Sequence, residues 1–238
     1  MADASPPNGE PCGGKDTNES ITTSEIIPIF VGPIKKKHLI HACILTSKAP
    51  FFKKCLESGM REQAENAIYL PEDDPEAFGI VANWMYTGSM PSTCKCRVLM
   101  SAYILADKLC MTNIQDAVME QLRWNLMDEE IILPVDVDWV WEKTGPGSKL
   151  REFMVDALHY SVMQQDEYQT AEGKNEHHLA VDLEAVMVMN GALGYQLYSK
   201  IFNVSAVRNQ ARKKTTSPYL RNCKYHCHAD EEECPSRK

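Results

Sequence analysis

Five side chains that can bind a metal ion lie close together in the sequence near its C-terminal end. They are Cys223, His226, Cys227, His228 and Cys234. Zinc in proteins is held by four nitrogen or sulfur donors in a tetrahedron. The pattern C-x2-H-x-H-x5-C supplies four such donors, Cys223, His226, His228 and Cys234, with Cys227 as a substitute. One interpretation is a structural zinc site. The other is a disordered tail with reduced thiols, which the departure from the usual zinc-finger spacings favours.

The rest of the sequence contains no catalytic signature. A Gly-rich phosphate loop, a G-x-S-x-G elbow and an H-E-x-x-H helix are all missing from it. Cys43 lies close to His41 in sequence, but the surrounding segment is apolar, and burial raises the pKa of a thiol instead of activating it. We therefore expect a protein that is not an enzyme and has no catalytic residue.

Length and composition are those of a globular protein with one or two domains. The chain has 238 residues, of which 44% are hydrophobic. Its net charge of −8 argues against nucleic-acid binding, although a small basic cluster contains Arg208, Arg212, Lys213 and Lys214. No run of apolar residues is long enough for a membrane span, and the N-terminal residues do not resemble a secretory signal. We expect an intracellular protein, in the cytoplasm or the nucleus, without membrane contact.

Local patterns predict strands followed by helices. Residues 26–32, 37–41 and 67–70 are predicted strands, and Pro28 places the first of them at a sheet edge or close to its own start. A helix is predicted after Asp74, with Asp74 as the N-cap, Pro75 at the first helical position and Gly88 at the end. Two amphipathic helices, 97–110 and 113–126, follow. Thr112 and Gln115 between them are predicted to form a capping box.

Several of these segments resemble one known family. The pattern H-x-x-x-L-x-x-x-x-P-F-F at 41–52 resembles the start of a BTB/POZ domain, with Ala49 where that family usually has a serine. The helix that ends in W-M-Y-T-G at 84–88 and the helix pair at 97–126 resemble its later parts. The resemblance covers residues 25–127. It implies an α+β fold, in which helices cap a small mixed sheet, and an intracellular protein-interaction module without catalysis.

Residues 132–160 resemble the helical extension of fungal-type BTB proteins, and the C-terminal tail is similar to theirs as well. The first 24 residues are rich in Pro, Gly, Ser and Asn, a composition that is typical of disordered segments. We therefore expect the following division of the chain: a disordered segment 1–24, the BTB/POZ domain 25–127, a helical extension 128–200 with a flexible linker near 163–178, and a polar tail 201–238 containing Cys and His.

The tripeptide Met60-Arg61-Glu62 is the sequence's main candidate for a binding site. A hydrophobic residue, any residue and a glutamate after the second helix resemble the motif by which BTB adaptors dock the cullin scaffold of a ubiquitin ligase. An apolar anchor can fill a pocket while a carboxylate sets the orientation. The resemblance implies partner binding by this tripeptide, with support from beneath by Phe51, Phe52 and Leu56. The alternative is a solvated loop.

The resemblance thus implies a protein-interaction module acting as a substrate adaptor of a cullin-type ubiquitin ligase. Two alternatives stay open, a transcription-linked BTB interaction protein and a BTB oligomerisation module. BTB dimers commonly exchange an extra helix and strand that precede the first strand. Residues 1–24 have almost no aliphatic side chains from which to build them, so we expect an exchanged homodimer to be absent or weak.

Overall fold

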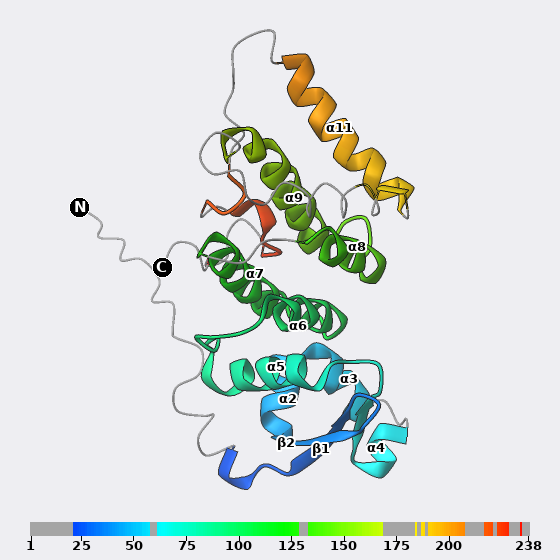
Figure 1. The fold of residues 1–238 in the computed structure, drawn as a ribbon. Helices are drawn as coiled ribbons and strands as arrows, with labels where there is room; N and C mark the ends of the chain where they lie inside the picture. The colour runs from blue at the N-terminus through cyan, green and yellow to red at the C-terminus, as the bar shows by residue number, and fades with distance from the viewer. Residues whose placement is uncertain are drawn as a thin grey trace, which may run out of the picture. The chain divides into compact units, whose positions relative to one another are not determined.

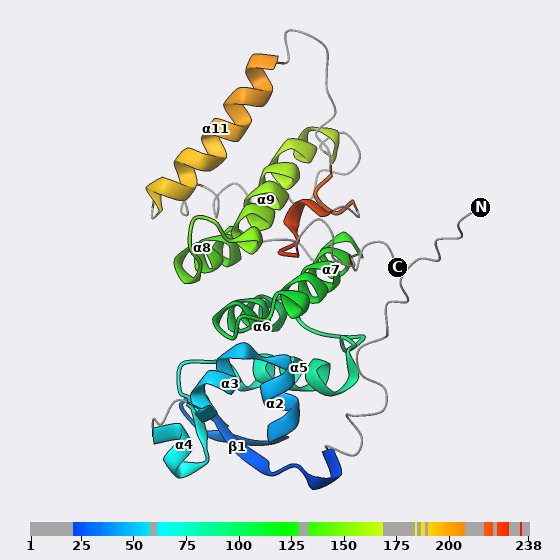
Figure 2. The ribbon, with the colours of Figure 1, turned by 180° about the vertical axis from the view of Figure 1, so that it is seen from behind.

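The computed structural model describes residues 21–57, 61–128, 133–168, 184, 187–188, 190–207, 217–220, 223–228 and 234. The chain forms two compact units, which meet in sequence between Glu72 and Asp73 (Figures 1 and 2). Among the described residues, no helix is both long enough and apolar enough to span a membrane.

The first unit contains a three-stranded mixed sheet with the strand order β2-β1-β3. Strand β1 (Ile26–Val31) pairs antiparallel with β2 (Lys36–His41) and parallel with β3 (Ile68–Leu70). Successive side chains of a strand point to opposite faces of the sheet. Accordingly, Ile27, Ile29 and Val31 of β1 are buried, while Phe30 stacks on Tyr69 of β3 with ring centroids 5.2 Å apart. The predicted small mixed sheet is confirmed.

Pro28 lies in the central strand of this sheet and not at its edge. The parallel pairing of β1 with β3 begins at Ile29, so Pro28 pairs only with Leu39 of β2. Of the two placements predicted for Pro28, the position near the start of the strand is correct. Proline is tolerated at this position because β1 does not yet pair with β3 there, so the missing N–H of Pro28 breaks no hydrogen bond to β3.

Three short helices complete the first unit: α2 (Ala42–Lys48), α3 (Pro50–Glu57) and α4 (Arg61–Glu65). Helices α2 and α3 lie over one face of the sheet (Figure 1). Their apolar side chains Ile44, Leu45 and Phe52 are buried there. Burial of these side chains stabilises the two helices, since isolated helices of this length are only marginally stable in water.

The second unit is helical. Helix α6 packs against α5 and α7, and α9 packs against α8, α11 and the 3-10 turn η2. The elements are α5 (Pro75–Thr87), α6 (Cys96–Lys108), α7 (Thr112–Asp128), α8 (Pro134–Lys143), α9 (Lys149–Tyr168), α11 (Gly191–Val207) and η2 (Cys223–Tyr225).

Some boundaries differ from those expected. Helix α9 continues through Tyr168, so the first part of the segment 163–178, expected to be a flexible linker, is helical, and 169–178 lie outside the described residues. Helix α11 runs to Val207, past the start of the expected tail at 201. Residues 21–23 are helical and Ser24 Oγ accepts a hydrogen bond from the Cys43 amide at 3.0 Å, so the expected disordered segment 1–24 is ordered at its end. Residues 1–20 and the basic cluster at 208–214 lie outside the described residues.

The ends of α5 are those predicted from the sequence. Asp74 Oδ1 accepts a hydrogen bond from the Glu76 amide at 2.8 Å, and Pro75 is the first helical residue. Gly88 ends the helix at φ 66°, a left-handed conformation that glycine adopts without strain. The predicted capping box at the next helix pair is wrong. Thr112 is already inside α7, and the Gln115 side chain donates to Asp107 Oδ1.

Replacing Asp74 with alanine should lower the free energy of unfolding by about 1 kcal/mol, because the Glu76 amide loses its capping acceptor. Denaturant unfolding monitored by circular dichroism measures this change. Asp74→Ser is the matched control, since serine also caps helices, and it should retain most of the stability. Equal losses in the two variants would contradict a capping role.

Candidate functional site

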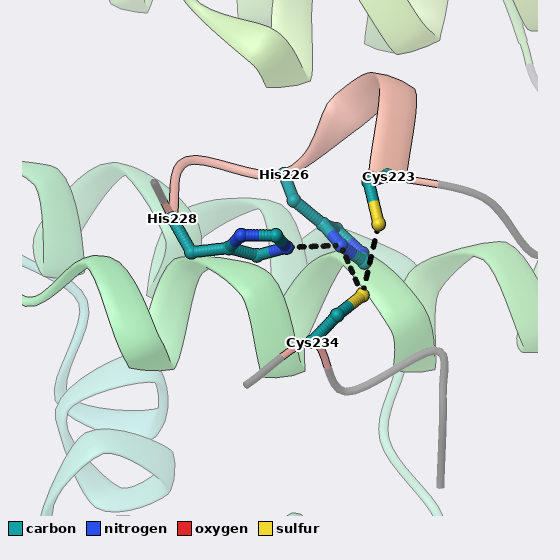
Figure 3. Close-up of side chains that lie close together, drawn as sticks. All are labelled: Cys223, His226, His228 and Cys234. Carbon is teal, nitrogen blue, oxygen red and sulfur yellow. Dashed lines mark hydrogen bonds between the residues drawn. The ribbon is translucent and has the colours of Figure 1, made fainter. Parts of the chain in front are cut away.

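Four metal-binding side chains come together near the C-terminal end of the chain. The ligand atoms of Cys223, His226, His228 and Cys234 all lie within 4.8 Å of one another (Figure 3). His226 Nδ1 is 3.2 Å from His228 Nε2 and 3.3 Å from Cys234 Sγ, and the two Sγ atoms are 3.1 Å apart. These are the four residues that the sequence pattern selected. Three of them come from η2 and the residues directly after it, and Cys234 joins them from further along the chain.

The C-terminal segment, which consists of the described residues 217–220, 223–228 and 234, carries this cluster. A buried carboxylate binds it to α7. Asp116 is 1% exposed. Its Oδ1 accepts a hydrogen bond from the Cys227 amide at 2.5 Å, and its Oδ2 accepts one from the His228 amide at 3.1 Å. Bonds to an ionised acceptor are about twice as strong as neutral ones. Asp116 therefore fixes the backbone between the two histidines.

Glu120 lies one turn after Asp116 on the same face of α7 and holds the ring of His226. Its Oε1 is 2.8 Å from His226 Nε2 and 2.7 Å from a guanidinium nitrogen of Arg123. Burial alone would lower the pKa of His226, but the bond to Glu120 and the nearby Asp116 and Cys234 outweigh it and raise this pKa. With Nε2 occupied by Glu120, the nitrogen that faces the cluster is Nδ1.

Cys227 does not belong to the cluster. Its Sγ is 3.2 Å from the Tyr103 hydroxyl on α6, and burial raises the pKa of the thiol. The role of substitute ligand considered for Cys227 is therefore not supported by its position, since its side chain points to α6 and not to the other donors.

The same segment also contacts α9, so that it lies between α7 and α9 (Figures 1 and 2). Phe153 is fully buried and packs edge-to-face on Tyr225, with ring centroids 5.2 Å apart. Asp156 Oδ2 accepts hydrogen bonds from the Tyr225 hydroxyl at 2.9 Å and from Lys224. Burial would raise the pKa of Asp156, but the ammonium groups of Lys200 and Lys224 outweigh it and lower this pKa.

The predicted partner-binding residues lie in the first unit. Met60 is outside the described residues, as is the side chain of Arg61. Arg61 and Glu62 begin α4, so this part of the segment is a helix and not the loop that was expected. Glu62 is half-buried and close to Cys55 of α3, whose pKa is raised by burial and then by the Glu62 carboxylate.

The three residues expected to support this segment all belong to α3. Phe52 is fully buried and packs edge-to-face on Phe51, while Phe51 and Leu56 are half-buried. Helix α3 contacts α4, the helix that begins at Arg61. Phe52 cannot touch a partner directly, so its contribution to any interface is to the packing of α3.

Comparison with known proteins identifies the segment that contains these strands and helices. Residues 29–126 match the family of BTB/POZ domains. BTB/POZ domain-containing protein 9 of Mus musculus is 33% identical over 107 residues, which are 44% of this chain and 18% of that protein. Residues 29–126 are a BTB/POZ domain. The BTB/POZ domain is a protein-interaction module, and this part of the chain is therefore one.

A plant relative aligns over a longer part of the chain than the BTB/POZ domain. BTB/POZ domain-containing protein At3g56230 of Arabidopsis thaliana is 26% identical over 153 residues, which are 63% of this chain and 52% of that protein. The chain thus spans about half of the plant relative and less than a fifth of the mouse relative. The assignment of α8 and α9 to a fungal-type extension continues to rest on sequence resemblance.

Proposed function

We propose that the chain is a substrate adaptor whose BTB/POZ domain docks on the N-terminal domain of a cullin scaffold. The observation that carries the proposal is the tripeptide Met60-Arg61-Glu62, which comes after α3 in the sequence and whose last two residues begin α4. It has the hydrophobic–any–Glu order of the docking motif in BTB adaptors, and it lies within the segment matched to the family.

The geometry of α3 and α4 fits such a role. The half-buried carboxylate of Glu62 lies in the first turn of α4, where the positive end of the helix dipole favours a negative charge. Lys53 and Lys54 are exposed on α3 and provide a polar rim. An interface hot spot usually has an apolar anchor surrounded by polar groups, and in this proposal the anchor is Met60.

An adaptor also needs a surface for its substrate. The helices outside the BTB/POZ domain offer one, since Tyr195 and Tyr198 of α11 are exposed aromatic side chains. Aromatic residues are enriched at protein interfaces. We therefore propose that the docking of the scaffold and the binding of the substrate use different parts of the chain.

The test is binding of the purified full chain to a cullin N-terminal domain, measured by calorimetry. We expect a dissociation constant in the micromolar range or lower. The double variant Met60→Ala/Glu62→Ala should weaken binding by at least about tenfold, because each side chain is a predicted hot-spot residue.

The matched control is Ile34→Ala/Glu72→Ala, which also removes one apolar and one acidic side chain, both exposed. It should bind like the unmodified chain. Binding that is equal in all three proteins would place the contact elsewhere. Lack of binding by a chain whose circular dichroism shows it to be folded would overturn the adaptor role and leave the BTB/POZ domain as another kind of interaction module.

A further inference from the structure

We propose that Cys223, His226, His228 and Cys234 bind one zinc ion, which closes the C-terminal segment into a loop where Asp116 and Glu120 hold it on α7. This site lies outside the BTB/POZ segment at 29–126 and does not depend on cullin docking. It is a structural site, with four protein ligands and no open position for a substrate.

The spacing of the four ligand atoms suits a tetrahedral ion of this size. Zinc–sulfur and zinc–nitrogen bonds of about 2.3 and 2.0–2.1 Å place neighbouring ligand atoms about 3.3–3.8 Å apart in a tetrahedron. In the cluster, the Sγ–Sγ distance of 3.1 Å and the Nδ1–Nε2 distance of 3.2 Å are below this range, and the Nδ1–Sγ distance of 3.3 Å is at its lower end. All four atoms lie within 4.8 Å of one another. Small outward rotations of the side chains would therefore seat the ion.

The environment of His226 orients its ring as a ligand. Glu120 occupies Nε2, so that Nδ1 faces the cluster, and a carboxylate on the second nitrogen of a histidine is the usual arrangement at zinc sites. Nδ1 carries either one proton or one lone pair, yet both His228 Nε2 and Cys234 Sγ lie within hydrogen-bond distance of it. A zinc ion that replaces the proton would take all three groups as ligands at once.

Donor type and charge favour zinc over calcium and magnesium. A tetrahedral set of two thiolates and two imidazoles suits zinc, whereas calcium and magnesium take oxygen ligands. Two thiolates cancel the charge of Zn²⁺, and the complex is then neutral. Neutrality matters because His226 and Cys234 are buried, where an unpaired charge would be costly.

The C-terminal segment already contacts two helices, and the ion would add bonds within the segment itself. Asp116 and Glu120 hold the segment on α7, and Phe153 and Asp156 hold it on α9. Within the segment itself, Cys234 contacts Cys223 of η2 and His226 directly after it through the cluster. Zinc would close the segment into a loop and keep it seated.

The first experiment measures metal in the purified full chain under reducing conditions. We expect about one zinc ion per chain and, after chelation, rebinding with a dissociation constant of about 50 nM or lower. Cobalt(II) is a spectroscopic probe for the same site. It should give the visible bands of tetrahedral coordination and a thiolate charge-transfer band.

Variants connect the metal to these residues. Cys223→Ser/Cys234→Ser should remove the bound zinc and the charge-transfer band, whereas the control Cys43→Ser/Cys110→Ser, with two cysteines outside the cluster, should keep both. Glu120→Gln should retain the ligands but weaken zinc binding by about 10- to 100-fold, as expected of a positioning residue. With zinc bound, trypsin should cleave after Lys224 about tenfold more slowly than after chelation.

Three results would overturn the proposal. One is a reduced, folded chain that does not bind zinc or cobalt. Another is zinc that stays bound in Cys223→Ser/Cys234→Ser. The third is an intact mass showing a Cys223–Cys234 disulfide in a protein that binds no zinc after reduction, because the segment would then be closed by that bond. The cobalt spectrum uses the unmodified chain, so the proposal can be tested even if the cysteine variants do not fold.

Discussion

Replacement of Phe153 by alanine is expected to lower the free energy of unfolding by about 3–5 kcal/mol. Phe153 is fully buried on α9, and its ring meets those of Tyr225 and Tyr219 edge-to-face at centroid distances of 5.2 and 6.2 Å. Alanine would leave a cavity between α9 and the C-terminal segment and would remove two aromatic pairs, each worth about 0.5–1.5 kcal/mol beyond the buried area. Denaturant unfolding measures the loss.

Two further variants separate this packing from a general effect of removing an aromatic ring. Tyr195→Ala removes a ring that is 74% exposed on α11, and its effect should stay within about 0.5 kcal/mol. Phe153→Leu refills most of the volume and should cost clearly less than Phe153→Ala. A loss below about 1 kcal/mol for Phe153→Ala would mean that the packing of Tyr219 and Tyr225 on α9 contributes little to the stability of the second unit.

The fold of the BTB/POZ segment was predictable because its local signals are strong and agree with one another. The apolar run of β1 and the Asp74 and Gly88 caps of α5 are visible in the sequence, and the structure contains the predicted strand and caps. Helix α11 begins inside the expected helical extension 128–200, but its continuation to Val207 was not predicted. It contains Gly191 and Gly194, and each glycine lowers helix propensity by about 1 kcal/mol relative to alanine.

Packing compensates for those glycines. Leu193 and Leu197 of α11 are fully buried, and α11 packs on α9. Gly194 also lies against the backbone of Met187, where an added Cβ would be 3.2 Å from a carbonyl oxygen. A close approach of this kind depends on the position of another segment, and a single sequence does not encode it in any local pattern.

At the candidate metal cluster, too, residues close together in the sequence could be predicted and residues far apart could not. Its four side chains could be selected from the sequence because they occur within twelve positions and are metal-binding types, and the structure places them close together. Asp116 and Glu120 were missed because they are more than a hundred residues away. Their spacing of four on a helix was the available signal, since it placed two carboxylates on a face with buried neighbours.

Replacement of Asp116 by asparagine should lower the free energy of unfolding by about 2–4 kcal/mol. The carboxylate is buried and accepts two backbone hydrogen bonds, from Cys227 and His228, and bonds to a charged group contribute about 1.5–3 kcal/mol each. Asparagine is nearly isosteric, but only one of its side-chain atoms accepts a hydrogen bond. Its NH2 group would therefore face a backbone N–H, leaving two buried donors in contact.

The control is Glu142→Gln, the same loss of charge at an exposed position on α8, which should change stability by less than about 0.5 kcal/mol. Combining Asp116→Asn with Cys223→Ser tests whether the two act on one segment. If Asp116 and the cluster are needed together to hold residues 223–228 in place, one substitution already releases the segment. The other then lowers the free energy of unfolding by less than it does alone. The combined loss should then fall short of the sum by about 0.5–3 kcal/mol. Strict additivity would instead mean that the Asp116 bonds and the cluster stabilise the chain independently.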